Sequence, residues 1–191
     1  MIETNWRVFC AIEVSGDVRQ QVSNHIGALR QGHDQVHASW VIHTNLHLTI
    51  RFIGNIALRK VDTLRAAAAR AVNGLVRFPI VFEGTGVFPG LNSPRVLWIG
   101  VNDASAGLAQ LYARLEKECT GSGFAQDDRS FTPHLTLARV REPSQARALA
   151  EDHLRSEFLP IEMLVSELLV IRSQMSSKGS TYTVMSRHPL I

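Results

Sequence analysis

Two short segments of the chain alternate between polar and apolar residues in the same way. Residues 47–50 and residues 134–137 each consist of histidine, leucine, threonine and a further aliphatic residue. Successive side chains of a β-strand point to opposite faces of a sheet, so residues two apart share a face. We therefore expect two half-buried strands, each with its histidine and threonine on one side and its aliphatic residues toward the core.

Apolar spacing and turn residues predict the remaining elements. Val18, Val22, Ile26 and Leu29 form one apolar stripe, which indicates a helix over about residues 18–30. Residues 172–180, which contain serine, lysine and glycine, are predicted to form a mobile loop, and a lid over a ligand is the alternative to a plain solvent loop. We expect further helices over about 58–72, 103–119 and 143–155, and strands over 6–14, 36–41, 46–53, 76–82, 85–88, 95–101, 131–140, 161–171 and 182–186.

The order of these elements predicts the class of fold. The two motifs lie 87 residues apart (134 − 47), and a helix follows each motif strand closely. We expect an α+β fold with two mostly antiparallel sheets that face a central cleft, helices on the outer faces and pseudo-two-fold symmetry. Since no break in composition suggests separable domains, residues 1–191 are expected to form one domain of two similar lobes.

Composition and charge narrow the class of protein. The 191 residues are 45% hydrophobic and 19% charged, which is typical of a soluble globular protein. The net charge of +3 permits a phosphate-bearing partner without requiring one. Cys10 and Cys119 lack metal-ligand spacing, and a reducing compartment is the simpler interpretation. No signal peptide or membrane span is found, so we expect a cytoplasmic monomer without an obligate protein partner.

The paired motifs predict acid–base chemistry. Histidine has an unperturbed pKa of about 6.5, so two histidines on opposite sides of a substrate can act as base and acid. Neighbouring threonines can bind an oxyanion or orient the imidazoles, which fits an in-line displacement at phosphorus. No carboxylate cluster is present to hold a hard cation, so neither a metal nor a cofactor is expected. A single motif would favour a solvated strand face, and the duplication favours a function.

The residues around both motifs resemble the signatures of the two-histidine (2H) phosphoesterase superfamily and, within it, the LigT-like RNA 2′,3′-cyclic phosphodiesterases. Trp40, seven residues before His47, adds to this resemblance. The matching segments are residues 7–11, 47–54, 86–89, 94–98 and 131–139.

The resemblance implies both a fold and an activity. The two motifs would face each other across a cleft and hydrolyse terminal 2′,3′-cyclic phosphates on RNA, such as tRNA halves, to 2′-phosphates. Some members join RNA ends through a 2′,5′ linkage. By position, His47 would be the general acid and His134 the base, and Thr49 and Thr136 would bind the phosphate. The residues alone do not order the two histidines.

Two arginines and one aromatic residue are further candidates for substrate binding. Arg139 matches a phosphate-binding arginine of the family, but strict alternation places it opposite His134, unless the strand bulges or ends near Ala138. The same alternation places Arg51 on the face of His47, as a secondary contact. Phe9 matches an aromatic residue that could stack on a base, and a core position is the alternative.

Other interpretations remain open at this point. The same chemistry could act on small cyclic nucleotides, or the cleft could bind RNA or nucleotides without turnover. His43 and His47 have the spacing of a zinc site on a helix, but the intervening Thr44 and Asn45 favour a turn. The histidines without motif context, which are expected at the surface, are His25, His33, His37, His153 and His188.

Overall fold

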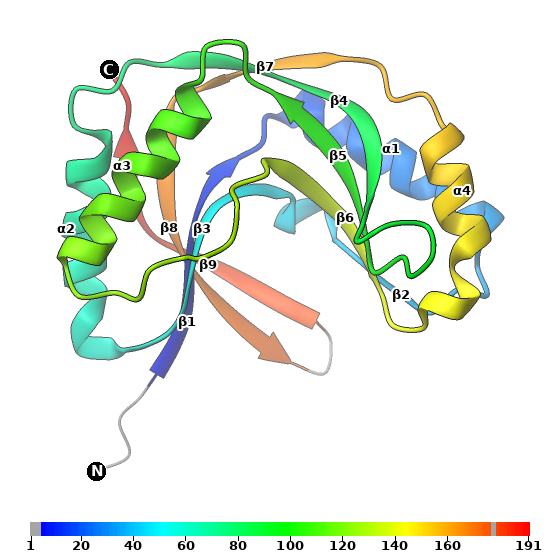
Figure 1. Ribbon diagram of the computed structural model, residues 1–191, viewed down its shortest axis with the longest axis horizontal. Helices are drawn as coiled ribbons and strands as arrows, with labels where there is room; N and C mark the ends of the chain where they lie inside the picture. The colour runs from blue at the N-terminus through cyan, green and yellow to red at the C-terminus, as the bar shows by residue number, and fades with distance from the viewer. Residues whose placement is uncertain (1–4, 177–178) are drawn as a thin grey trace.

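The computed structural model describes residues 5–176 and 179–191 as two sheets with helices outside them (Figure 1). The helices are α1 (Gly16–Gly32), α2 (Val61–Val72), α3 (Gly107–Gly121) and α4 (Arg147–Arg155). The strands are β1 (Asn5–Glu13), β2 (Ala38–Trp40), β3 (His47–Ala57), β4 (Phe78–Phe88), β5 (Val96–Asn102), β6 (His134–Val140), β7 (Ile161–Val165), β8 (Glu167–Ser176) and β9 (Gly179–Pro189).

The strands form two antiparallel sheets. The first sheet has the order β3-β1-β8-β9, and the second has the order β2-β6-β5-β4-β7. Helices α2 and α3 cover the first sheet, and α1 and α4 cover the second (Figure 1). The predicted α+β class, with two antiparallel sheets and helices outside them, is confirmed.

Local sequence explains where the helices begin. The Ser15 side chain accepts a hydrogen bond from the Val18 N–H at 3.3 Å and caps α1, whose predicted apolar stripe is buried. Helix α3 begins later than predicted because Asp103 reaches forward and accepts from the Leu108 N–H at 2.6 Å. Residue 106 between them has a left-handed φ of 57°, which delays the first helical turn.

The apolar run 161–171 is two strands rather than the one predicted. It divides at Ser166, and β7 pairs with β4 in the second sheet whereas β8 pairs with β1 and β9 in the first. The prediction of a mobile loop over 172–180 is also wrong, because β8 continues to Ser176 and β9 begins at Gly179. The pairing of β8 with β9 continues to Ser176 and Gly179, although none of the described residues between 172 and 183 is fully buried. Ser177 and Lys178 lie outside the described residues.

Two histidines expected at the surface are buried. His153 is 0% exposed and His188 is 8% exposed. The two rings of His153 and His25 lie against each other with 3.0 Å between His25 Nε2 and His153 Nδ1, and the Trp98 carbonyl lies 3.1 Å from His153 Nε2. Burial lowers the pKa of His153 to about 4, so this side chain is neutral near pH 7.

The core extends behind both sheets, and a smaller apolar cluster lies on the opposite face of the first sheet. This second cluster contains Phe9, Ala11, Leu169 and Ile171, with Phe52 and Tyr182 packed against it. It forms an apolar floor beside the motif strand β3. Among the described residues, no helix is long and apolar enough to cross a membrane.

Candidate active site

The two motif strands lie next to each other where the sheets meet. Strand β3 is an edge strand of the first sheet and contacts β6 of the second. His47 is the first residue of β3, and His134 is the first residue of β6. The fold therefore brings the beginnings of two strands from different sheets to one place.

His47 is held on both sides of its ring. Its Nδ1 lies 2.7 Å from the Asn45 carbonyl oxygen, and its Nε2 lies 3.0 Å from the Thr49 hydroxyl. The rings of Phe9 and Tyr182 pack against the imidazole, with centroids at 4.8 Å and 5.2 Å. Because the carbonyl can only accept, Nδ1 carries the proton and Nε2 is the atom free to exchange one.

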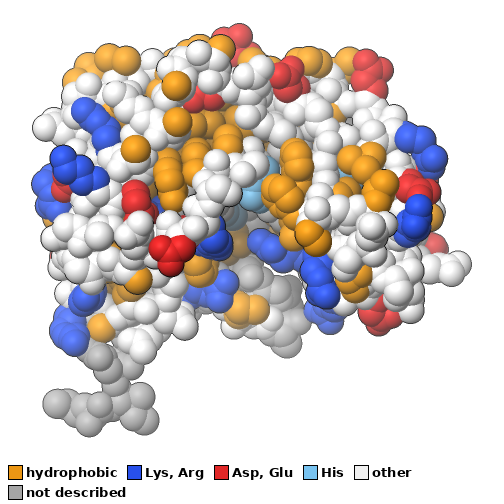
Figure 2. Space-filling view, in the orientation of Figure 1, with side chains coloured by type: hydrophobic (Ala, Val, Ile, Leu, Met, Phe, Trp, Pro, Cys, Tyr) orange, Lys and Arg blue, Asp and Glu red, His pale blue; other side chains and the backbone are white. Residues whose placement is uncertain are grey.

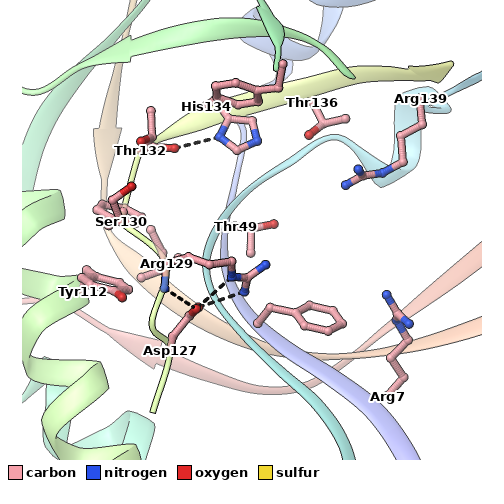
Figure 3. Close-up of a pocket in the computed structure, with 14 residues that line it drawn as sticks. Arg7, Thr49, Tyr112, Asp127, Arg129, Ser130, Thr132, His134, Thr136 and Arg139 are labelled. Atoms are coloured by element: carbon pink, nitrogen blue, oxygen red, sulfur yellow. Dashed lines mark hydrogen bonds and ion pairs between the residues drawn. The ribbon is translucent and has the colours of Figure 1, made fainter. Parts of the chain in front are cut away.

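His134 repeats the carbonyl contact and the packing between two rings. Its Nδ1 lies 2.7 Å from the Thr132 carbonyl oxygen, which Figure 3 shows as a dashed line. The rings of Phe88 and Trp98 flank the imidazole, with centroids at 5.0 Å and 6.2 Å. In both motifs the carbonyl two residues before the histidine fixes the tautomer, and the Nε2 atom remains available for proton transfer.

The surroundings lower the pKa of both histidines. Burial is the largest cause in each case, the carbonyl contact opposes it, and the positive charge of Arg139 lowers both values further. Both imidazoles are therefore neutral over more of the physiological pH range than a free histidine. An anion bound between them would favour their protonated forms.

A bulge interrupts both motif strands at the same position. The pairing of β1 with β3 shifts between Cys10 and Ala11 and leaves Ile50 without a partner on β1. The pairing of β5 with β6 shifts between Leu97 and Trp98 and leaves Leu137 without a partner on β5. These two residues are also 87 positions apart (137 − 50), so the motif repeat includes the bulge.

The bulge in β3 overturns the prediction that Arg51 shares the face of His47. The Arg51 side chain is 1% exposed and forms an ion pair with Glu116 of α3. Its Nη2 also donates to the Ala125 carbonyl at 2.6 Å. One extra residue reverses the alternation, so Arg51 turns into the protein and Phe52 turns toward the cleft.

The bulge in β6 has the opposite effect on Arg139. Leu137 and Ala138 are both fully buried, and the exposed Arg139 side chain returns to the face of Thr136. Of the two possibilities left open by the sequence, a bulge next to Ala138 is the one found. Arg139 and Phe52 are 87 residues apart (139 − 52), so the two halves place an arginine and a phenylalanine at equivalent positions.

Two adjoining cavities form the cleft. The larger, about 730 Å³, is lined by His134 and the loop around Arg129, and the smaller, about 290 Å³, is lined by His47 and Tyr182. Figure 2 shows histidine atoms deep in the hollow at the centre of this face, framed by hydrophobic atoms, with arginine or lysine atoms below them. The residues that line both cavities are Arg7, Thr49, Phe52, Thr136 and Arg139.

The cleft contains residues that the sequence interpretation did not select. Arg7 shares a face of β1 with Phe9, and strand alternation could have identified it. Strict alternation would place Phe52 on the face opposite His47, whereas the bulge turns it toward the cleft. Tyr182 reaches the site from β9, which is distant in sequence, so no local pattern placed it there.

Phe9 lies in the floor of the cleft. It is 3% exposed, and its ring packs against both His47 and Tyr182. Of the two interpretations of Phe9, burial favours packing over stacking on a base.

No group of three or more His, Cys, Asp or Glu side chains within residues 5–176 and 179–191 is arranged to hold a metal ion.

Comparisons with known sequences agree with the motifs. A family model described as the 2′-5′ RNA ligase superfamily matches residues 18–176. An RNA 2′,3′-cyclic phosphodiesterase of Thermotoga maritima is 34% identical over 181 residues, which cover 94% of this chain and 92% of the relative. The enzyme of the same name from Methanothermobacter thermautotrophicus is 32% identical over 94% of this chain and 96% of its own length. These matches confirm the resemblance inferred from the motifs.

Solved structures share the fold. Escherichia coli LigT complexed with 3′-AMP has a TM-score of 0.76 and 27% sequence identity, and the match covers 98% of this chain and 99% of that chain. TT0787 of Thermus thermophilus has a TM-score of 0.77 over 96% of this chain and 97% of that chain, at 24% identity. The second likeness concerns the fold alone.

Proposed function

We propose that this chain, which belongs to the 2′-5′ RNA ligase superfamily, hydrolyses 2′,3′-cyclic phosphates at RNA ends to 2′-phosphates. The observation that carries this proposal is the repeated geometry of the cleft. Two histidines, each held through Nδ1 by a backbone carbonyl, line two adjoining cavities, one histidine in each, and two threonines and one arginine line both cavities. The relatives from Thermotoga maritima and Methanothermobacter thermautotrophicus are named for this activity.

The reaction is an in-line displacement at phosphorus. His134 Nε2 takes a proton from the attacking water, the water oxygen bonds to phosphorus, and the bond from phosphorus to the 3′ oxygen breaks. His47 Nε2 gives a proton to that leaving oxygen, so that the products are a 3′-hydroxyl and a 2′-phosphate. The assignment of acid and base follows the family resemblance, since both histidines have the same Nδ1 contact.

The neighbouring side chains stabilise the charge that develops on the phosphate. The Thr49 and Thr136 hydroxyls and the Arg139 guanidinium line both cavities, where they can donate to the non-bridging oxygens. The Thr49 hydroxyl already lies 3.0 Å from His47 Nε2, so a phosphate oxygen bound there would contact both groups. A 5′-hydroxyl of a second RNA in place of water would give a 2′,5′ linkage.

The activity is expected to persist when divalent metal ions are removed. The proposed acid, base and phosphate-binding groups are all side chains of the protein, so EDTA should leave kcat within about twofold of its value without chelator. The measurement is the conversion of an oligonucleotide 2′,3′-cyclic phosphate to the 2′-phosphate, followed by chromatography. Loss of turnover in EDTA with recovery on adding a metal, or a 3′-phosphate product, would contradict the proposal.

The dependence of kcat/KM on pH is expected to be bell-shaped, with its maximum on the acidic side of pH 6.5. One histidine must be neutral and the other protonated, and burial together with the Arg139 charge lowers the pKa of both. In Arg139→Gln the positive charge is lost, so both pKa values rise and the bell should move to higher pH while its height falls.

The matched control is Arg141→Gln, because Arg141 is exposed two residues further along and lines neither cavity. This variant should keep the wild-type profile. A rate that is flat from acid to alkaline pH would argue against the histidine pair, and a profile that Arg139→Gln leaves in place would argue against its electrostatic effect.

A further inference from the structure

We propose that Arg7 binds the phosphodiester next to the cyclic phosphate and thereby makes the site selective for RNA chains over mononucleotides. This inference rests on the proposed function and specifies its substrate class. A mononucleotide cyclic phosphate has no second phosphate, whereas every longer RNA has one at a fixed number of bonds from the reacting end. A cation at the border of the cleft would therefore act on the longer substrate only.

Arg7 lies at the boundary of the two cavities. It lines both of them, as do Thr49, Thr136 and Arg139. Figure 3 shows Arg7 and Arg139 on facing sides of the cavity, one rising from below and one descending from above. A substrate whose reacting phosphate is held by Arg139 and the threonines thus has Arg7 across the same opening.

The Arg7 side chain is placed by stacking rather than by an ion pair. Its guanidinium carbon lies 4.6 Å from the centre of the Phe52 ring. This contact holds the guanidinium beside the ring, and among the described residues its N–H groups make no hydrogen bond. A cation beside an aromatic ring is also the combination that proteins use to follow a single-stranded nucleic acid.

No acidic side chain among the described residues pairs with Arg7. Two neighbouring arginines differ in this respect, because Arg51 pairs with Glu116 and Arg129 contacts Asp127 through both Nε and Nη2, at 2.8 and 2.9 Å. Arg139 is likewise not seen to pair with a carboxylate in the part of the chain that the structure describes. Two positive charges in one cleft repel each other, and an anionic chain with two phosphates would neutralise both.

The neighbouring strand offers a matched control. Arg172 of β8 stacks on the Trp6 ring at 4.0 Å, so it makes the same kind of contact. It pairs in register with Val8, whereas Arg7 pairs with Ser173, and Ser173 lines the smaller cavity. Arg172 therefore lies on the other face of the sheet, away from the cleft.

The test compares kcat/KM for adenosine 2′,3′-cyclic phosphate and for a trinucleotide with the same end. The wild type should favour the trinucleotide, and Arg7→Gln should reduce that preference about tenfold, the value of one hydrogen-bonded contact to a charged group. Arg172→Gln should keep the wild-type preference. Both variants alter partly exposed side chains, and circular dichroism and melting temperature confirm their folding.

A second substrate isolates the phosphate itself. A methylphosphonate in place of the phosphodiester next to the end removes one negative charge and keeps the bases. It should lower kcat/KM of the wild type about tenfold and that of Arg7→Gln by less than twofold, because the two changes remove the same interaction.

The outcomes separate this inference from the proposed function. If the wild type hydrolyses both substrates and Arg7→Gln lowers both equally, or if the methylphosphonate has no effect on the wild type, the inference is overturned and the proposed function stands. If the wild type hydrolyses neither substrate, the proposed function fails, and the inference that rests on it fails too.

Discussion

Replacement of His134 by alanine is expected to lower kcat on a trinucleotide 2′,3′-cyclic phosphate by roughly 10²–10⁴-fold, the usual contribution of a general acid or base. His47→Ala should have an effect of the same size. Each histidine is oriented by one carbonyl, and no other side chain with a pKa near neutrality lines either cavity among the described residues. KM should change much less, because the phosphate is held mainly by threonine and arginine.

The two substitutions together should cost little more than the more harmful one alone, since a base without its acid contributes little to an in-line displacement. His43→Ala is the matched control, because His43 is exposed four residues before His47 and lines neither cavity. Both site variants require a melting curve, since His47 packs between two rings. Wild-type turnover in either single variant would exclude the proposed mechanism.

Substitution of Arg51 by methionine is expected to lower the free energy of unfolding by about 3–5 kcal/mol, the usual cost of removing one partner of a buried ion pair. Arg51 is 1% exposed, and its partner Glu116 also accepts hydrogen bonds from Thr120 at 3.1 Å and from the Asp127 N–H at 3.0 Å. The substitution leaves that carboxylate without its cation. Denaturant unfolding measures the loss.

Turnover per folded molecule should remain near the wild-type value in this variant, because Arg51 faces away from the cleft. Arg70→Met is the matched control: Arg70 pairs with Glu118 of the same helix α3, but its side chain is 52% exposed, so the expected cost is about 0–1 kcal/mol. If Arg51→Met had normal stability and a raised KM, Arg51 would instead contact the substrate, as strict alternation predicts.

Strict alternation predicts the faces of the motif residues but misplaces both arginines, for one physical reason. The family resemblance had already selected Arg139 for the site. Strand alternation has a period of two, so it holds for His47 and Thr49 but reverses beyond a single unpaired residue. Isoleucine is common in regular strands, so nothing in the local sequence marks Ile50 as the site of a bulge. The bulge is visible only in the pairing of each motif strand with its neighbour, β1 for β3 and β5 for β6. That pairing belongs to the tertiary structure and cannot be read from the local sequence.

Other differences arise from contacts that are distant along the chain. The apolar run at 161–171 is nearly continuous in sequence. Its first part, β7, pairs with β4 and its second part, β8, pairs with β1, and the sequence of the run does not specify these partners. His153 was expected at the surface because it has no motif context, but α4 turns this residue toward the Trp98 carbonyl. The helix stripe of α1, by contrast, was predicted correctly, because its period and its cap are both local.

The order in which the chain visits the two sheets has a mechanical consequence. Strand β1 lies in the first sheet, β2 in the second, β3 in the first, β4 to β7 in the second, and β8 and β9 in the first. The backbone thus passes between the sheets four times, and helices α1 and α3 each cover the sheet that the preceding strand did not join. Neither sheet with its helices can therefore be produced as one continuous fragment. The four backbone connections also restrain the two sheets from moving apart about a hinge. The walls that carry His47 and His134 are therefore held in place before any substrate arrives.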